Sequence, residues 1–443
     1  MFLYYLRLAV KSLRATPGLT AVTLLAIALG IAVPTASLSI RHVFAQDPVP
    51  EKSDRLFNVR VESWDANSDF FGPAGEPPKH IAYRDMIGLR GMDPEVPSTG
   101  VASATIFAFP EGREAQPFQA GVRLCHADFF SMFQAPFAHG GGWSRDVDLS
   151  LEQVAVLSYE GNQRLFGGGD SVGRKVRLGE QSFTVLGVLA PWQPTPQYYD
   201  IINNAFGRPR DVFLPFDFIK DQALALSRVG DNDNWGPNVP RDDPEVFFMG
   251  TEMTWIQFWV ELDPADRGQY HQAVDRYALT QKELGRFPRD LNNRVSPVME
   301  WLAIRQVNPP GVDALVLVSM LFLLVCCLNL TGLLLAKFLA QSGVLGVHRA
   351  VGASKRSIFV QRLVECQLVA SVGGLLGALL AGVILRVVDW GAPDFIIRPE
   401  LFRLDLFTLA MAVGLALLAG LVSGLYPAWR ACRIAPALQL KLQ

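Results

Sequence analysis

Four stretches of the chain are apolar throughout, and they interrupt a sequence that elsewhere mixes apolar and polar positions. Each lacks a charged side chain and is long enough, at about 20 residues, to cross the hydrocarbon core of a bilayer as a helix. The four stretches are residues 15–40, 314–336, 366–385 and 406–429. The hydrophobic pattern therefore predicts a membrane protein with four transmembrane helices.

The long polar stretch between the first two apolar segments, residues 41–313, has a mixed α and β pattern. Alternating apolar and polar positions predict strands, and apolar positions three or four apart predict helices. The predicted strands are residues 101–109, 118–124, 154–158, 175–178 and 182–188, and the predicted helices are residues 127–133, 159–166 and about 263–285. We therefore expect a large α+β extracytoplasmic domain inserted between the first and second spans.

The later part of this domain changes in composition. Residues 191–250 are rich in Pro, Asn, Asp and aromatic side chains, which predicts long loops. Residues 245–262 look like strand pairs. We expect two subdomains, the second formed by about residues 191–260 and inserted into the first.

Basic residues gather on one side of the predicted topology. They are frequent in residues 1–14, 337–365 and 430–443, whereas the short loop 386–405 carries both signs of charge. The positive-inside rule assigns basic loops to the cytoplasm. Both termini and the loop between spans two and three are therefore predicted to be cytoplasmic, and residues 41–313 to lie on the far side.

The leader before the first apolar segment has its own pattern. Arg7, Lys11 and Arg14 are spaced by four and three residues, which puts them on one face of a helix. This predicts a short interfacial helix over residues 1–14, on the cytoplasmic membrane surface. The apolar segment that follows is longer than the ~7–15 residues typical of a cleaved signal peptide, so we expect it to be retained.

Composition limits the possible partners. Half of the 443 residues are hydrophobic, 19% are charged and the net charge is −2, so no strong field favours nucleic acid. The five cysteines do not form a disulfide framework. No predicted span contains an ionisable side chain, which argues against an ion path through the bilayer and against a secondary transporter.

Residues 168–175, G-G-D-S-V-G-R-K, are close to a phosphate-binding loop. Lys175 stands one place late for that motif, Val176 replaces the Ser or Thr that would hold magnesium, and a hairpin follows instead of a helix. We interpret the stretch as a turn entering the hairpin. The run from Asp231 approaches calcium-loop spacing, but Trp235 stands at an oxygen-ligand position, which favours a plain loop. We expect no catalytic residue, metal or cofactor in this chain, and a membrane-anchored enzyme is a minor alternative.

Small residues recur every fourth position in the last two spans. They are Gly373, Gly377 and Ala381 in the third span and Gly420 and Gly424 in the fourth. Such spacing lets helices approach closely in lipid. These faces serve either packing within the chain or a dimer contact, and the pattern leaves both open.

Three motifs in the second half of the chain carry a family resemblance. They are C-L-N-L-T-G-L-L-L-A-K (327–337), G-V-H-R-A-V-G-A-S-K-R-S-I-F-V-Q-R-L-V-E-C (346–366) and S-G-L-Y-P-A-W-R-A-C-R-I-A-P-A-L (423–438). Together they closely resemble the FtsX-like, MacB-type permease family of ABC transporters. The run V-A-V-L-S-Y to F-T-V-L-G-V (154–188) resembles the periplasmic core domain of that family. The resemblance covers most of the chain and is weakest at residues 191–300.

The resemblance implies a multi-pass protein of the bacterial inner membrane that is a non-catalytic transport subunit. In this family two permease chains pair and two ATPase subunits bind beneath them, so ATP and magnesium are expected on the partner ATPase. Hydrolysis would move the periplasmic domains, a mode called mechanotransmission. The second permease chain would make a homodimer or a heterodimer, and a periplasmic adaptor and an outer-membrane channel are further expected partners.

The resemblance also implies an ATPase-coupling helix within residues 337–365. Its residues would be Gly346, Val347, His348, Arg349, Ala350, Gly352, Ala353, Ser354, Lys355 and Arg356. From their residue types alone, Gly352, Ala353 and Ser354 are predicted to interrupt one helix and to cap a new one that starts near Ser354. The family usually has an acidic residue where Val344 stands and Arg where His348 stands, so the ATPase contact is expected to differ, and a heterodimer is one explanation.

Export of a peptide, an antibiotic or another small natural product is the leading functional reading of this resemblance. Relatives with the same architecture support two alternatives. One is a regulatory permease that senses antimicrobial peptides or activates cell-wall hydrolases, and the other is a permease that releases lipoproteins from the membrane. The sequence does not identify the substrate.

Overall fold

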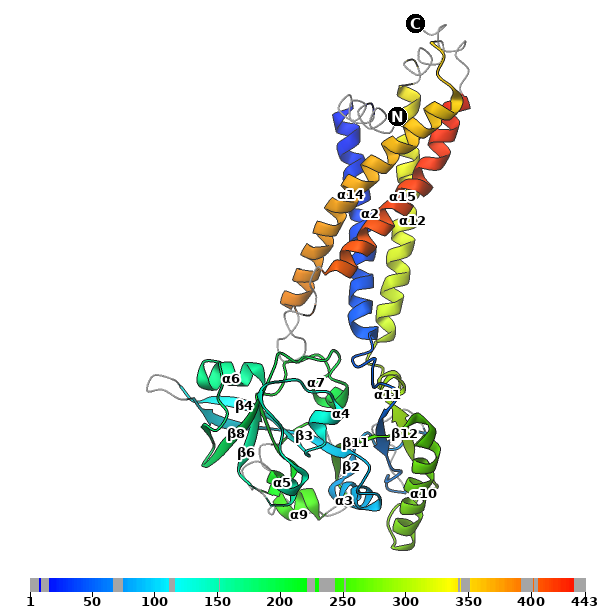
Figure 1. Cartoon of the computed structure of the whole chain (residues 1–443). Helices are drawn as coiled ribbons and strands as arrows, with labels where there is room; N and C mark the ends of the chain where they lie inside the picture. The colour runs from blue at the N-terminus through cyan, green and yellow to red at the C-terminus, as the bar shows by residue number, and fades with distance from the viewer. Residues whose placement is uncertain are drawn as a thin grey trace. The chain divides into compact units, whose positions relative to one another are not determined.

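The computed structural model divides the chain into two compact units, which are described separately (Figure 1). The helical unit comprises Met1–Ala45 and Asn308–Gln443, and the α/β unit comprises Gln46–Val307. The residues that the structure describes are 8, 16–66, 75–110, 116–150, 152–220, 228–230, 244–250, 252–341, 343, 351–391, 401 and 405–433.

Long apolar helices form the described part of the helical unit. They are α2 (Pro17–Ala45), α12 (Pro310–Ala340), α14 (Lys355–Gly391) and α15 (Leu406–Arg433). All four are long and apolar enough to cross a membrane, and each covers one of the four apolar stretches from which spans are predicted. The predicted interfacial helix lies outside the described residues except for Leu8, and so does the tail beyond residue 433.

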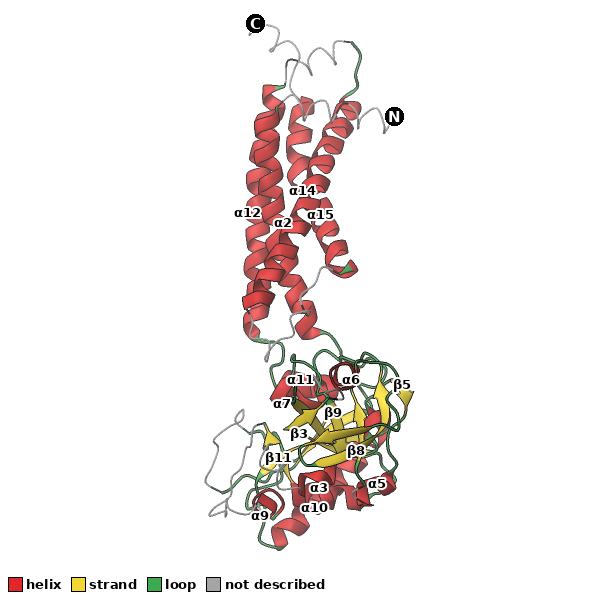
Figure 2. Ribbon diagram, turned by 90° about the vertical axis from the view of Figure 1, so that its left-hand side faces the viewer, coloured by secondary structure: helices red, strands yellow, loops and turns green. Residues whose placement is uncertain are grey.

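The four helices pack side by side (Figure 2). Their shared core includes Ile31 of α2, Leu334 of α12, Val369 of α14 and Ala416 of α15. Large apolar side chains also remain exposed along the outside of the helices, for example Leu379 at 64%. An exposed apolar surface of this kind suits lipid rather than water.

Twelve strands within the described part of the α/β unit join in one sheet, whose main path runs β12-β1-β11-β3-β4-β9-β6-β8-β5. The strands are β1 (Leu56–Arg60), β2 (Ile81–Ala82), β3 (Ser98–Phe109), β4 (Phe118–Cys125), β5 (Phe137–Gly140), β6 (Val154–Leu157), β7 (Lys175–Leu178), β8 (Gln181–Leu189), β9 (Val212–Pro215), β10 (Arg228–Val229), β11 (Thr254–Glu261) and β12 (Arg294–Pro297). The helices are α3 (Tyr83–Met92), α4 (Phe129–Met132), α5 (Arg145–Ser150), α6 (Tyr159–Phe166), α7 (Ile201–Asn204), α9 (Pro244–Met249), α10 (Arg267–Glu283) and α11 (Val298–Ile304).

The long strand β3 joins the two ends of this sheet. Its first residues, from Ser98 to Val101, pair with β11, and its later residues, from Ala102 to Ala108, pair with β4. The stretch 191–260, predicted to contain an inserted subdomain, contributes both β9 and β11 to the same sheet.

Several local predictions for this unit are confirmed. β7 and β8 form an antiparallel hairpin across Gly179, and Val176 and Leu178 are buried while Lys175 and Arg177 are exposed. The stretch G-G-D-S-V-G-R-K enters that hairpin as a turn, in which Gly173 has a φ of +81° that favours glycine.

Two local predictions were wrong. Residues 245–262 were expected to form strand pairs, but the first part is helix α9 and only Thr254–Glu261 is a strand. The predicted loops at 191–250 contain strand β9, which lies between β4 and β6. Both errors arise because tertiary burial decides the state of a short apolar run more than its own pattern does.

Candidate functional site

The end of α12 and the beginning of α14 form the junction where the predicted coupling segment enters the helical unit. Gly352 adopts a φ of +106°, a conformation that a residue with a Cβ rarely takes. The Ser354 hydroxyl accepts a hydrogen bond from the backbone N–H of Ser357 at 3.1 Å, as an N-cap does. The helix then begins at Lys355, so the predicted cap is confirmed, while the helix expected before the break lies outside the described residues.

A buried ionic cluster ties the two helices at this junction. The Glu365 carboxylate on α14 bridges two cations: Lys337 Nζ on α12 lies 2.7 Å from its Oε1, and Arg362 Nη1 lies 2.7 Å from its Oε2. All three side chains are less than 5% exposed. We call Lys337, Arg362 and Glu365 the junction triad.

Neighbouring groups hold the Arg362 guanidinium in place. Its Nη1 also donates to Gln341 Oε1 at 2.9 Å, and its Cζ lies 4.8 Å from the centre of the Phe338 ring. Both partners come from the end of α12 or the residue that follows it. Because separating buried opposite charges costs several kcal/mol, these contacts oppose sliding of α14 along α12 at this end.

A small apolar cluster connects the same region to α15. Ile358 of α14 and Cys432 of α15 are buried together, and Ala353 packs against them. The first turn of α14 therefore contacts α15, whereas Arg362 and Glu365, further along the same helix, contact Lys337 of α12 and its neighbours. A displacement of the segment before Lys355 would act on both neighbours through these contacts.

The structure describes only part of the predicted coupling set. Gly346, Val347, His348, Arg349 and Ala350 lie outside the described residues. Gly352, Ala353, Ser354, Lys355 and Arg356 form the turn and the start of α14, and Lys355 and Arg356 are exposed there.

The small residues of the last two spans face other helices of the same chain. A Cβ added at Gly373 would lie 2.6 Å from Ile27 of α2, and one added at Gly377 would lie 2.9 Å from the backbone oxygen of Ala28. Ala381 is fully buried against α2 in a cluster with other small residues.

The glycines of α15 make the same kind of contact with α14. A Cβ at Gly420 would lie 2.4 Å from that of Ala370, and one at Gly424 would lie 2.7 Å from that of Cys366. Of the two alternatives left open by the pattern, packing within the chain is therefore the one that the structure supports.

Sequence reasoning missed the junction triad. Lys337 and Glu365 were assigned to the loop between predicted spans, whereas the structure places both inside continuous helices. A usable signal was present: one apolar run ends at a cation, and the next begins beside an anion with Arg362 three residues earlier. Opposite charges at matching ends of adjacent spans predict a pairing across the helices.

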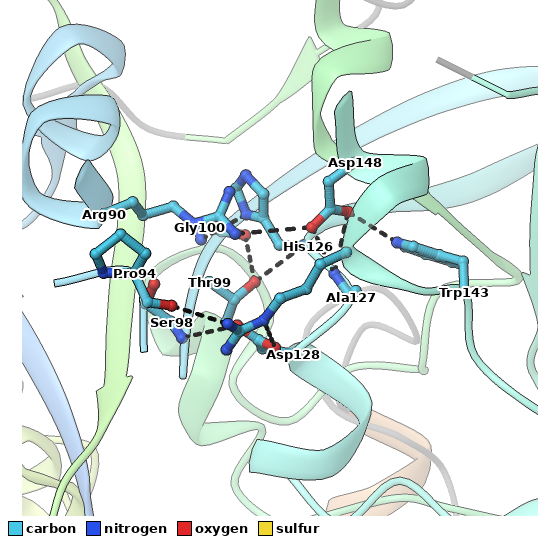
Figure 3. Close-up of polar contacts among 11 residues, drawn as sticks. Arg90, Pro94, Ser98, Thr99, Gly100, His126, Ala127, Asp128, Trp143 and Asp148 are labelled. Carbon is cyan, nitrogen blue, oxygen red and sulfur yellow. Dashed lines mark hydrogen bonds and ion pairs between the residues drawn. The ribbon is translucent and has the colours of Figure 1, made fainter. Parts of the chain in front are cut away.

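The α/β unit contains a buried histidine that bears on the enzyme alternative (Figure 3). His126 Nδ1 accepts a hydrogen bond from the backbone N–H of Gly100 at 3.1 Å, and its ring stacks on Phe216 at 4.9 Å. Burial and the nearby Arg90 hold the pKa of His126 well below its ordinary value. A neutral imidazole whose Nδ1 is occupied by the backbone serves packing rather than proton transfer.

Asp148 completes the same cluster. Its carboxylate accepts from the backbone N–H of Ala127 at 3.1 Å and from Trp143 Nε1 at 2.9 Å, and Arg90 lies 3.7 Å away (Figure 3). Burial raises the pKa of Asp148 despite these contacts. The cluster fixes the end of α3, the turn after β4 and the helix α5 against one another.

Comparison with known proteins bears on both units. A family model described as MacB-like periplasmic core domain matches residues 20–277, and one described as FtsX-like permease C-terminal matches residues 316–436. The solved periplasmic region of MacB from Actinobacillus actinomycetemcomitans matches 59% of this chain and 96% of its own at 12% identity, with a TM-score of 0.37.

Two curated relatives illustrate the similarity. The pyoverdine export ATP-binding/permease protein PvdT of Pseudomonas syringae pv. tomato is 24% identical over 439 residues, covering 95% of this chain and 57% of the relative. The macrolide export ATP-binding/permease protein MacB of Syntrophobacter fumaroxidans is 28% identical over 361 residues, covering 73% and 47%. The chain thus spans about half the length of the curated relatives it matches.

The motifs of the second half, the run in the core domain and the family models agree, so the family resemblance is confirmed. The core-domain model alone covers more than half of the chain. The chain therefore belongs to the family of membrane permeases that combine a MacB-like periplasmic core domain with an FtsX-like permease C-terminal domain.

Proposed function

We propose that this chain is the permease subunit of an ABC exporter, in which ATP hydrolysis by a partner ATPase drives movement of the α/β unit. The names of the curated relatives combine an ATP-binding function, a permease function and export. The 443 residues contain no G-x-x-x-x-G-K-[ST] motif, so ATP and magnesium would bind to the partner.

The junction triad is the observation that carries the mechanism. Force applied at residues 346–356 would enter the helical unit at the start of α14. The bridging carboxylate of Glu365 links the early part of α14 to α12. In the sequence, α12 comes directly after the α/β unit, which ends at Val307. In this proposal the triad makes the two helices respond together to the ATPase.

The arrangement in the cell follows from the basic loops and the family. The chain would lie in the bacterial inner membrane with both termini in the cytoplasm and the α/β unit in the periplasm. A second permease chain would complete the transporter, and a periplasmic adaptor and an outer-membrane channel would extend it. The cargo would be a peptide, an antibiotic or another small natural product.

The proposal can be tested in a reconstituted complex. The full chain is purified with its native partners, the co-purifying ATPase is identified, and ATP hydrolysis is measured in nanodiscs with and without the permease. Arg349→Ala and Gly352→Ala should each reduce stimulation of ATP hydrolysis. For Gly352, the added Cβ disfavours a φ of +106° by roughly 1–3 kcal/mol.

Gly414→Ala is the matched control, because Gly414 lies in the α15 interior with no neighbouring atom within 4 Å of an added Cβ. It should leave stimulation unchanged. Unchanged stimulation and transport in both coupling variants would refute the coupling role, and purification without any ATPase would refute the transporter assignment. Co-purification with a sensor kinase or a cell-wall hydrolase would favour the regulatory alternative.

A further inference from the structure

A cleft of about 350 Å³ opens on the α/β unit. Three chain segments line it: residues 48–51 ahead of β1, Phe133 and Gln134 just after α4, and residues 192–198 after β8. Its volume falls within the range of small-molecule sites, which is roughly 300–1,000 Å³.

The inner wall of the cleft is aromatic and rigidly packed. Phe133 and Tyr198 are each 1% exposed, and their ring centres lie 5.4 Å apart in an edge-on arrangement. Trp192 at the side of the cleft is half-buried and stacks on Tyr199 at 5.4 Å. At 1% exposure Phe133 and Tyr198 offer little surface to the cleft, so Trp192 is the more accessible ring of its wall.

Hydrogen bonds outside the lining fix the two loops that form the walls. Gln46 Nε2 donates to the backbone oxygen of Thr195 at 2.9 Å, which joins the first segment to the third. Gln197 Nε2 donates to the backbone oxygen of Gly207 at 2.7 Å, which anchors the third segment near α7. The cleft is therefore preformed, as binding sites for small ligands usually are.

A single exposed carboxylate stands at the rim. Glu51 makes no ion pair within the described residues, and its carboxylate accepts a long hydrogen bond of 3.4 Å from Gln134 Nε2. The neighbouring cation, Lys52, is turned away, since its Nζ pairs with Glu261 at 2.9 Å and donates to the backbone oxygen of Ser131 at 3.0 Å. The rim thus offers a negative charge without a counter-charge from the described part of the chain.

Negatively charged side chains also lie near the inner wall of the cleft. Burial raises the pKa of the Tyr198 phenol well above its ordinary value, and Tyr199, Asp47 and Glu261 raise it further. The phenol is therefore uncharged at physiological pH. Because Lys52 offsets the charge of Glu261, Glu51 and Asp47 are the carboxylates that favour a positively charged occupant over an anion.

We propose that this cleft binds a small organic cation in which a ring or short apolar group carries an ammonium. The apolar group would contact Trp192, and the ammonium would lie beside the Glu51 carboxylate. Aromatic faces attract cations because of their quadrupole, so the walls and the rim select for the same charge. An anion of equal size would meet repulsion from Glu51, which no cation among the described residues pairs with.

The binding test uses the full chain in nanodiscs of zwitterionic lipid, without nucleotide or partner, so its outcome is independent of the export proposal. The chain carries nine tryptophans, which are labelled as 5-fluorotryptophan, and Trp192→Phe assigns the ¹⁹F resonance of Trp192. Benzylammonium is titrated against benzyl alcohol, which has nearly the same shape but no charge.

Benzylammonium should shift the Trp192 resonance saturably, with a Kd at least about fivefold lower than that of benzyl alcohol. Glu51→Gln should remove this difference by weakening benzylammonium alone. Glu180→Gln, which removes an exposed charge in the turn between β7 and β8, should change the Kd by less than about twofold. The remaining eight tryptophan signals report whether each variant keeps its fold.

Three results would overturn the proposal. One is the absence of any saturable shift at Trp192, and another is equal affinity for the charged and neutral probes. The third is an unchanged benzylammonium Kd in a folded Glu51→Gln variant.

Discussion

Neutralising Glu365 tests whether the junction triad holds α12 and α14 together. Glu365→Gln keeps the size of the side chain but removes the only charge that the two cations share within the triad. Lys337 and Arg362 would then remain buried beside one another with no counter-ion from the triad. Since both are less than 5% exposed, water cannot replace the lost carboxylate without opening the junction.

The distances within the triad set the size of the free-energy loss expected for Glu365→Gln. Each cation has a nitrogen 2.7 Å from a carboxylate oxygen. At an effective dielectric constant of ~20, opposite charges about 4 Å apart attract by about 4 kcal/mol, before desolvation is subtracted. Breaking a buried pair by removing one partner typically costs about 3–5 kcal/mol, because the other charge is left uncompensated. We expect the opening free energy of the junction to fall by about that amount.

Amide hydrogen exchange is the suitable assay, because the two units need not unfold together and a single global midpoint would mix them. Exchange is followed by mass spectrometry on the full chain in nanodiscs, in peptides covering the start of α14 and the end of α12. A loss of about 3 kcal/mol corresponds to roughly 100-fold faster exchange. Arg356→Gln removes an exposed charge from the same helix and should change the opening free energy by less than about 0.5 kcal/mol.

A double-mutant cycle separates the pairing from other effects of the substitution. Lys337→Gln and Glu365→Gln are measured singly and together, and a direct contact predicts an interaction energy of about 1–3 kcal/mol. The reasoning is refuted if the single effects add within about 0.5 kcal/mol. It is equally refuted if Glu365→Gln leaves exchange at the start of α14 unchanged.

Two further predictions concern packing and pH. Gly420→Ala should weaken the α14–α15 contact by about 1–3 kcal/mol and speed exchange in α15, because the new Cβ would lie 2.4 Å from that of Ala370; Gly414→Ala is the control and should not speed it. Burial raises the pKa of Asp85 from 3.8 to about 6, so the folded state binds this proton more tightly than the unfolded chain does. Stability of the α/β unit should therefore fall as pH rises from about 4 to 6, by at most about 3 kcal/mol. Asp85→Asn should flatten that part of the curve of thermal midpoint against pH, and an unchanged slope would contradict the assignment.

Features with a local cause were predictable from the sequence. The four long helices follow from apolar length alone, and the hairpin of β7 and β8 follows from alternation around Gly179. The cap at Ser354 follows from a Gly-Ala-Ser break ahead of a basic helix start. In each case the signal lies within a few residues of the structure it predicts.

Features decided by distant parts of the chain were not predictable in the same way. Strand β9 is four residues long and ends in proline, yet it is fully buried because β4 and β6 lie on either side of it. The junction triad depends on how α2 and α15 hold α12 and α14, which lets the long side chains of Lys337 and Glu365 meet between the two helices. The aromatic cleft needs three segments that meet only in the folded α/β unit.

The two kinds of helix contact in this chain have different mechanical consequences. Small-residue contacts, such as that of Gly420 with Ala370, depend on close approach, and they are short-ranged and weakly directional. A buried ion pair adds little net stability over apolar packing of the same volume, but it penalises any register in which a charge loses its partner. The junction triad therefore fixes one register of α14 on α12 at the end next to Gly352, while the contacts along the rest of the spans tolerate small shifts. In the proposed mechanism the ATPase moves the permease from that end, so the junction triad is the contact through which the movement passes from α14 to α12.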